Sequence, residues 1–146
     1  MVHGRYPNPY IVNEKHKIWI EIRWILYWIF TEFYLNKKIE TEKDIKIASE
    51  EFLKKGIKNI VITLGEKGCY FANDKENFFM NAFKLKEPVV DTTGAGDAFN
   101  GALAVGLSKN LDIKEVLTFA NKVGAISTTK QGAAASMPSM EDLKNY

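Results

Sequence analysis

The feature that most constrains the fold is a loop of small residues that runs directly into a helix-forming segment. Residues 91–97 read DTTGAGD, and residues 98–107 continue as AFNGALAVGL, with small side chains that allow close packing on one face. Such a loop lies at a helix N-terminus, where free backbone N–H groups and the helix dipole attract an anion. Gly94 and Gly96 lack a Cβ, so the backbone can approach a phosphate closely. The sequence therefore predicts an anion site at the start of this helix.

Asp97 adds a carboxylate in the first turn of the same helix. A hydroxyl held between Asp97 and a bound phosphate would have a base on one side and the anion site on the other. Phosphoryl transfer to an alcohol requires this arrangement. Taken alone, however, the short pattern G-x-G-D is better explained as a tight glycine turn capped by Asp97.

Helix and strand patterns alternate around the loop. Thr41 and the acidic residues after it predict a helix start, and Gly56 predicts the end of that helix. Residues 59–64 form a β-branched run bounded by glycines, which is typical of a buried parallel strand. The other predicted elements are two strands that form a hairpin and one helix: residues 69–72, 77–85 and 113–129.

Composition excludes several classes of protein. The chain has 146 residues, enough for one domain with a buried core. Its net charge is +2, and the basic residues are scattered among acidic ones, so a nucleic-acid partner is not favoured. Cys69 is the single cysteine, which excludes an internal disulfide framework and a cysteine-rich zinc site. The apolar surroundings of Cys69 predict a core residue.

The first 35 residues differ in character from the rest. All three tryptophans lie in residues 18–30, where Glu21 and Arg23 interrupt the apolar run. The run is shorter than the roughly 20 apolar residues that a membrane-spanning helix needs, so a buried strand or helix is favoured over a membrane span. The first fifteen residues are polar and lack the apolar core of a secretory signal, so we expect a cytoplasmic protein.

Four segments together resemble the ribokinase-type sugar kinases of the PfkB family. The run DTTGAGDAFNGAL, residues 91–103, is among the most specific motifs of that family. TLGEKG, residues 63–68, is similar to the family's T-L-G-x-x-G loop around the nucleotide phosphates. Asn121 falls where the family holds the adenine ring, and residues 129–138 are similar to the ribokinase tail K-x-G-A-x-x-S-x-P.

The resemblance covers residues 36–146 and implies an α/β, ribokinase-like fold. These residues would form the C-terminal portion of a mainly parallel sheet flanked by helices, as a nucleotide-binding and catalytic-base region. Residues 1–35 show no such resemblance and are expected to be an atypical N-terminal segment.

The resemblance also implies a role for each matching residue. Asp97 would act as general base on the sugar hydroxyl, and Gly94, Ala95 and Gly96 would form the anion hole. ATP would be the phosphoryl donor, with Mg²⁺ bridging its phosphates. Asn121 has an alternative as an ordinary helix-surface residue. The residues implied in nucleotide binding are Thr63, Leu64, Gly65, Glu66, Lys67, Gly68, Gly96, Asp97 and Asn121.

A potassium site behind the anion hole is implied as well. The ion would fix the loop so that its N–H groups point at the transferring phosphate. Several ligands would act through backbone carbonyls, which is how a lysine can belong to the set. Plain turn chemistry is the alternative for Asp91 and Ser136. The implied ligands are Asp91, Thr93, Ser127, Lys130, Gly132 and Ser136.

The N-terminal part of the chain departs from the family. Ribokinases carry a further N-terminal half with most of the parallel sheet and the sugar pocket. Of the family's N-x-x-E motif, Glu32 matches the glutamate, whereas Ile29 replaces the asparagine. We therefore expect the chain alone not to be a competent sugar kinase. Its exposed sheet edge and apolar faces would suit a second copy of the chain or a complementing N-terminal chain.

Three functions follow from these observations. The first is an ATP-dependent sugar kinase, with ribose as the favoured sugar. The second is a remnant that binds ATP or ADP without turnover. The third is an interaction or membrane-surface protein built on the aromatic segment 18–30. Nucleotide binding without turnover would separate the second from the first, and partition into lipid vesicles would identify the third.

Overall fold

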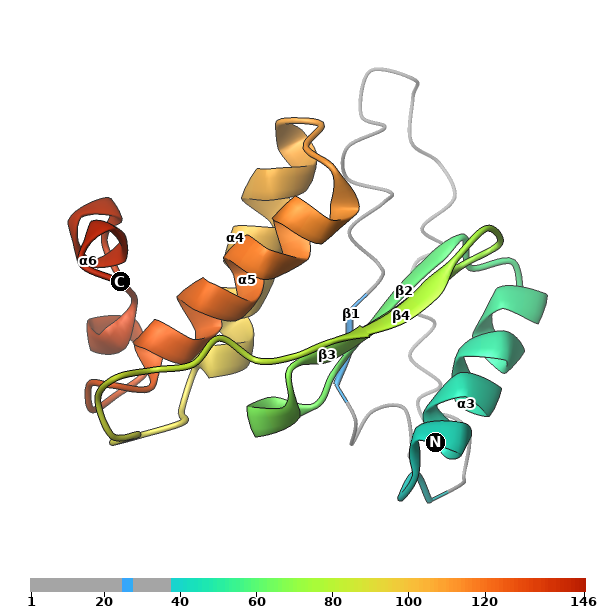
Figure 1. Ribbon diagram of the computed structural model, residues 1–146, viewed down its shortest axis with the longest axis horizontal. Coiled ribbons are helices and arrows are strands. Elements are labelled where there is room, and N and C mark those ends of the chain that lie inside the picture. Colours follow the sequence, from blue (N-terminus) through green and yellow to red (C-terminus); the bar gives the residue numbers. More distant parts are fainter. Residues whose placement is uncertain (1–24, 28–37) are drawn as a thin grey trace, which may run out of the picture.

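The computed structural model describes residues 25–27 and 38–146, and Figure 1 shows the arrangement of its elements. Glu32 and Ile29 of the N-x-x-E comparison, and most of the aromatic segment 18–30, lie outside the described residues. The elements, in chain order, are β1 (Ile25–Tyr27), α3 (Glu42–Lys54), β2 (Asn59–Thr63), η2 (Gly65–Lys67), β3 (Cys69–Asn73), β4 (Asn77–Met80), α4 (Ala95–Ser108), α5 (Ile113–Ser127), η3 (Ala134–Ser136) and α6 (Met140–Lys144).

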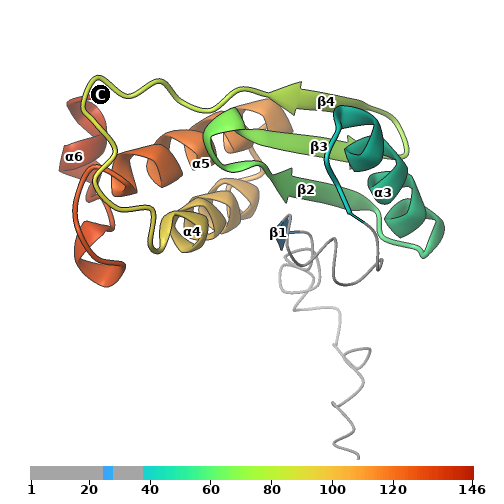
Figure 2. The ribbon, with the colours of Figure 1, turned by 90° about the horizontal axis from the view of Figure 1, so that it is seen from below.

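The four strands form one sheet with the order β1-β2-β3-β4, which lies on the α3 side of the molecule (Figure 2). β1 pairs with β2 in parallel, and β2–β3 and β3–β4 are antiparallel. The α/β fold class is confirmed. Of the mainly parallel sheet implied for the whole fold, the described residues contain one parallel pairing, β1–β2. The predicted strand over residues 77–85 is too long: β4 ends at Met80, because its partner Cys69 is the first residue of β3.

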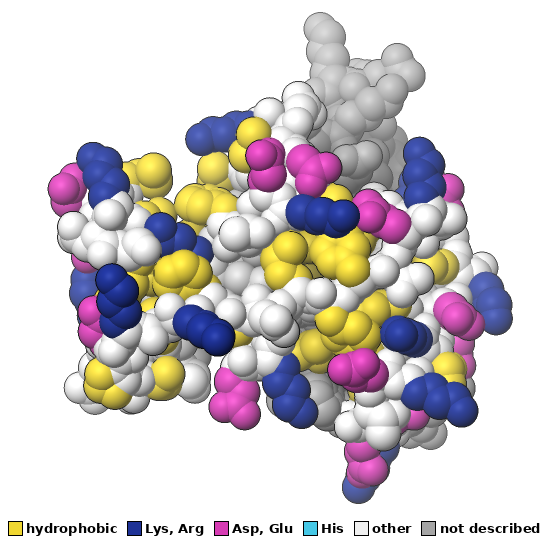
Figure 3. Space-filling model, in the orientation of Figure 1, with side chains coloured by type: hydrophobic (Ala, Val, Ile, Leu, Met, Phe, Trp, Pro, Cys, Tyr) yellow, Lys and Arg dark blue, Asp and Glu magenta, His cyan; other side chains and the backbone are white. Residues whose placement is uncertain are grey.

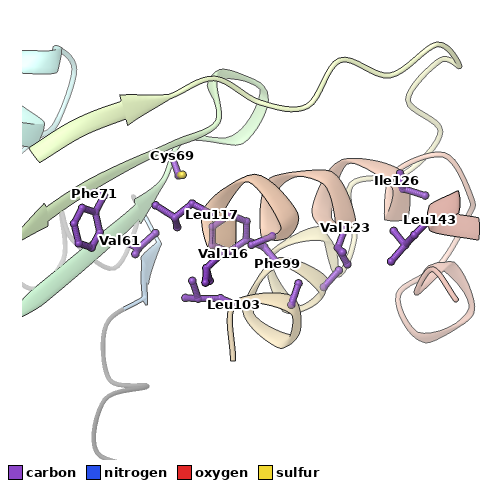
Figure 4. Packing of buried hydrophobic residues seen from close by; sticks show 13 residues of the cluster. Val61, Cys69, Phe71, Phe99, Leu103, Val116, Leu117, Val123, Ile126 and Leu143 are labelled. Atoms are coloured by element: carbon purple, nitrogen blue, oxygen red, sulfur yellow. The ribbon is translucent and has the colours of Figure 1, made fainter. Parts of the chain in front are cut away.

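Residues on the two faces of the sheet pack with different helices, because successive strand residues point to opposite sides. On one face, Val61 and Phe71 belong to the core cluster that includes α4 and α5 (Figure 4). On the other face, Ile60 and Tyr70 pack in a second cluster with Phe52 of α3. The predicted core position of the single cysteine is confirmed, since it is fully buried in the first cluster.

Helices α4 and α5 approach closely because glycines lie where they touch. A Cβ on Gly106 of α4 would lie 2.8 Å from Val116 Cγ1 of α5. A Cβ on Gly124 of α5 would lie 3.2 Å from the carbonyl oxygen of Ala95. The small face predicted for residues 98–107 is therefore used for close packing. It brings the start of α4 beside the second half of α5.

The sequence signals located the helix ends well. Thr41 is the N-cap of α3, and its backbone N–H donates to the Asp44 carboxylate at 2.8 Å in a capping box. Gly56 follows the helix with a φ of 89°, a conformation that glycine adopts without steric cost. α5 ends at Ser127 rather than at residue 129, because Thr128 is its C-cap.

The surface carries both signs of charge. Figure 3 shows Lys and Arg side chains interspersed with Asp and Glu side chains on the face in view, with apolar side chains between them. Of the helices within residues 38–146, none combines the length and the apolar character needed to cross a bilayer.

Candidate active site

The predicted anion site lies at the first turn of α4. Gly94 is the N-cap with a φ of 79°, and Ala95, Gly96 and Asp97 are the first three helical residues. A Cβ on Gly94 would lie 3.1 Å from Ala133, so glycine suits both the left-handed backbone and the close approach of the loop before η3. The first N–H groups of a helix have no partner within the helix and can bind an anion.

Two details refine this picture of the α4 start. The Ala95 N–H lies 3.2 Å from the Thr92 carbonyl oxygen, so this group of the predicted anion hole is already engaged within the loop. The Asp97 side chain is exposed. A carboxylate in that position is accessible to a hydroxyl group of a molecule that comes from solvent or is held by another part of a larger protein.

Asp91 joins the loop before α4 to the loop before η3. Its Oδ1 accepts the Thr93 N–H and its Oδ2 accepts the Gly132 N–H, both at 2.9 Å. The Thr93 side chain, followed by these two backbone N–H groups, holds the pKa of the Asp91 carboxyl below its usual value. The Asp91 N–H and the Val90 N–H both donate to the Thr128 carbonyl, which fixes the loop to the end of α5.

A cavity of about 710 Å³ lies between this loop, the end of β2 and the second half of α5. Its volume is in the range of small-molecule sites, which measure about 300–1,000 Å³. The lining residues are Thr63, Gly65, Glu66, Gly68, Ala82, Phe83, Leu85, Val89, Thr92, Ala95, Gly96, Phe99, Asn121, Gly124, Ala125 and Thr128.

The cavity unites three motifs that are far apart in the sequence. Thr63, Gly65, Glu66 and Gly68 come from the TLGEKG loop, Ala95 and Gly96 from the start of α4, and Asn121 from α5. The other predicted nucleotide residues lie elsewhere. Leu64 and Lys67 line a second cavity, and Asp97 lines neither cavity.

The second cavity, of about 600 Å³, lies beside the start of α3 and is lined in part by Glu40, Glu42 and Glu66. Lys67 and Lys84 line it too, so the charged side chains leave the two cavities with a similar balance, whereas only the first cavity adjoins the N-terminus of α4, the positive end of that helix. The first cavity is therefore the better site for a nucleotide.

The TLGEKG loop is shaped by Gly68. This residue is buried, with a φ of 97°. A Cβ there would overlap the Met80 carbonyl oxygen and lie 2.5 Å from Ala82 N. The Leu64 N–H donates to the Gly68 carbonyl at 2.7 Å and closes the loop. The loop can therefore lie against the chain after β4 only with glycine at this position.

The residues implied as potassium ligands lie in and around the two loops that Asp91 joins. Ser127 and Ser136 are fully buried, and each hydroxyl donates to a backbone carbonyl, so the hydroxyl oxygens keep lone pairs for a cation. The Lys130 ammonium pairs with Asp142 at 2.9 Å, so Lys130 could contribute to a cation site only through its backbone carbonyl. An oxygen-only donor set with one carboxylate fits a hard cation, the class to which potassium belongs.

No group of three or more His, Cys, Asp or Glu side chains within residues 38–146 is placed to hold a metal ion.

Sequence reasoning missed the apolar walls of the cavity. Phe83, Leu85, Val89 and Phe99 line it, and none was predicted as a site residue. A signal was present: residues 81–86 read NAFKLK, with apolar residues alternating with lysines. That alternation predicts a strand, and it also indicates an extended segment with its apolar side chains on one face, here turned toward the cavity.

Residues 16–140 match the sequence profile of the pfkB family carbohydrate kinases. The chain belongs to the PfkB family of carbohydrate kinases. The match begins inside the segment 1–35, so it extends further toward the N-terminus than the motifs alone. The boundary between an atypical segment and a ribokinase-like region at residue 36 stays a prediction.

Relatives of this PfkB-family chain include kinases for different sugars. Ribokinase of Staphylococcus aureus (strain COL) is 37% identical over 107 residues, which cover 73% of this chain and 34% of that protein. Fructokinase-2 of Zea mays is 44% identical over 93 residues, which cover 58% of this chain and 27% of that protein. The chain therefore spans about a third of the length of the curated relatives it matches.

Solved structures confirm the ribokinase-like fold. The Arabidopsis thaliana ribokinase complexed with ribose and ATP superposes with a TM-score of 0.77 at 28% identity, covering 84% of this chain and 40% of that one. The Thermotoga maritima ribokinase superposes with a TM-score of 0.70 at 35% identity, covering 83% of this chain and 41% of that one.

Proposed function

We propose that the chain is the nucleotide-binding and catalytic-base part of an ATP-dependent sugar kinase, with ribose as the acceptor. The observation that carries this proposal is the single cavity that joins the TLGEKG loop, Asn121 and the start of α4. The apolar walls suit a purine base, and the N-terminus of α4 suits the phosphates. Such a kinase would work in the cytoplasm, where ATP is available.

In the proposed reaction, Asp97 accepts the proton of a sugar hydroxyl while the hydroxyl oxygen attacks the terminal phosphate of ATP. The backbone N–H groups of Gly94 and Gly96 face the transferring phosphate and stabilise its charge. Ala95 contributes less than these two, because its N–H is shared with the Thr92 carbonyl. The TLGEKG loop and Asn121 keep the nucleotide in place.

Two cations belong to the proposal. Mg²⁺, when bound with ATP, neutralises charge on the phosphates. Potassium would be held by oxygens of Asp91, Thr93, Ser127, Lys130, Gly132 and Ser136. The role of Asp91 is structural as well, because its carboxylate fixes the distance between the two loops.

Turnover by this chain alone is expected to be poor. Asp97 is exposed and lines neither cavity, so the described residues provide no pocket that holds an acceptor hydroxyl beside it. Correct positioning of reactants can supply about 7–11 kcal/mol of a barrier. The same observation favours a second candidate function, which is nucleotide binding without turnover. A segment outside the described residues, a second copy or a complementing N-terminal chain would supply the acceptor pocket.

Calorimetric titration of the chain with ADP tests the nucleotide site. Ala125→Phe would place a large side chain in the cavity, and we expect it to weaken ADP binding at least about tenfold, by the loss of well-packed contacts. Val105→Phe is the matched control, since Val105 is exposed on α4 and does not line the cavity. Equal ADP affinity of both variants and the unmodified chain would place the nucleotide elsewhere.

An assay of ADP release with ribose, Mg²⁺ and potassium in excess tests turnover. We expect little activity from the chain alone. A rate within about tenfold of ordinary sugar kinases, which turn over near 1–100 s⁻¹, would show that no further part is needed.

A further inference from the structure

The loop between α5 and η3 is not held by its own backbone. Among the described residues, no hydrogen bond between two backbone groups involves residues 130–132. At one end of this loop, the Gly132 N–H donates to Asp91 Oδ2 at 2.9 Å. At the other end, the Lys130 ammonium donates to Asp142 Oδ1 at 2.9 Å. Two carboxylates therefore hold the loop, one from the segment before α4 and one from α6.

Asp142 is a rigid anchor for Lys130. Its Oδ2 accepts the Ser139 N–H at 2.8 Å and the Ser139 hydroxyl at 2.6 Å in the capping box of α6, which leaves Oδ1 for the ammonium. The next residue, Leu143, is buried in the core cluster of α4 and α5, so α6 is fixed against the fold. Exposed ion pairs are usually weak because two flexible side chains lose freedom, whereas here one of the two is already ordered.

The end of the loop that Asp91 holds lies against the anion site. Asp91 Oδ1 accepts the Thr93 N–H, and Thr93 directly precedes Gly94, the N-cap of α4. Ala133, which follows Gly132, approaches Gly94 so closely that a Cβ there would lie 3.1 Å from it. A movement of the loop would therefore be transmitted to the first N–H groups of α4.

We propose that Asp142 is a positioning residue for phosphate binding, which acts through Lys130 and the loop 130–132 on the anion site at the start of α4. The inference rests on the proposed function for its phosphate ligand. It goes further because it gives a role in binding to a carboxylate of α6 that lines neither cavity. Loss of the ion pair lets the loop move, so the N–H groups at residues 94–96 are less well oriented for a phosphate.

Titration of the Asp142→Asn variant with ADP and with adenosine tests the proposal. The asparagine oxygen can still accept from Ser139 in the capping box, but the ammonium loses its charged partner. For a partly exposed ion pair, we expect the ADP affinity to fall about two- to fivefold. Adenosine has no phosphate, so its affinity should stay unchanged. Unchanged ADP affinity, or an equal loss for ADP and adenosine, would overturn the positioning role.

Variants of the partner and a matched control complete the titration. Lys130→Met should weaken ADP binding as Asp142→Asn does, Lys130→Arg should retain it, and the double variant should bind no more weakly than either single variant. Glu141→Gln is the control, because Glu141 pairs with Lys144 at 3.2 Å within α6 and does not reach the loop. An equal loss of ADP affinity in Glu141→Gln would refute the proposal.

Amide hydrogen exchange, followed by NMR without nucleotide, separates this inference from the proposed function. The N–H groups of Gly132 and Thr93 both donate to Asp91, so Asp142→Asn should speed their exchange about two- to fivefold, whereas Glu141→Gln should not. If the unmodified chain does not bind ADP, the proposed function fails and the phosphate role fails with it. If it binds ADP but Asp142→Asn changes neither exchange nor ADP affinity, the inference alone is overturned.

Discussion

Substitution of Gly68 by alanine should destabilise the fold more than any other glycine change in the TLGEKG loop. Gly68 is buried with a φ of 97° and a ψ of −126°. The alanine Cβ would overlap the Met80 carbonyl oxygen and lie 2.6 Å from Asn81 C. These are backbone atoms of the segment that leaves β4, so they cannot move aside as a flexible side chain could.

Two contributions set the magnitude. A residue with a Cβ in this sparsely populated backbone conformation costs about 1–3 kcal/mol. Relieving the overlap requires a backbone shift, and overpacking of this kind costs about 1–3 kcal/mol. Together they give about 2–6 kcal/mol, a large part of the roughly 5–15 kcal/mol that stabilises a domain. At about 2–4 °C per kcal/mol, the unfolding temperature should fall by about 10 °C.

Gly65 in the same loop provides the matched control. It also has a positive φ, of 60°, but a Cβ there would meet no atom within 4 Å. Gly65→Ala should therefore lower the stability only because alanine is unfavourable in this backbone conformation, by about 1–2 kcal/mol. Thermal unfolding followed by circular dichroism compares the two variants. If Gly68→Ala loses no more stability than Gly65→Ala, the close contact with residues 80–82 does not constrain the loop.

Three further predictions concern the carboxylates. In a complete kinase that contains this region, Asp97→Asn should lower kcat at least about 10²-fold with little change in ADP affinity, because a general base contacts the acceptor hydroxyl; steady-state kinetics and titration measure both. ADP binding or thermal stability should rise when potassium replaces sodium, and Asp91→Ala should remove that response; equal behaviour in both salts would leave Asp91 a turn residue. Since the folded pKa of Asp91 is lowered, its contribution to stability is complete above its unfolded pKa of about 4 and is lost as the pH falls through the folded value. Below about pH 4, the stability of Asp91→Asn should therefore fall less steeply with pH than the stability of the unmodified chain.

The sequence located the elements around the candidate site because each has a local physical signature. Glycines at Gly94 and Gly96 before a small-residue helix predict a phosphate-binding turn, and both residues lie at the start of α4. The β-branched run at residues 59–64 predicts a buried strand, and β2 is buried along its centre. Periodicity and caps are properties of neighbouring residues, so they can be read before the fold is known.

The parts that escaped prediction depend on contacts between distant segments. Nothing near Asn121 in the sequence indicates that its amide meets Cys69 and Asn81. The cavity walls at Phe83 and Leu85 were assigned to a strand, because alternation does not tell which surface an extended segment faces. The end of β4 was also missed, since it is set by where its partner strand begins.

The described residues form the cavity that we propose for the nucleotide, but they form no pocket that would hold the acceptor hydroxyl of the sugar. Asp91 holds the anion-site loop through contacts within this chain, and Gly68 fixes the TLGEKG loop in the same way. Every residue that lines the cavity between them lies within residues 63–128. Asp97, one turn into α4, faces outward and depends on another segment or another chain to bring a hydroxyl to it. In the proposed kinase, nucleotide affinity and turnover should therefore be separable, and a partner that supplies the acceptor pocket should raise turnover without changing the nucleotide site.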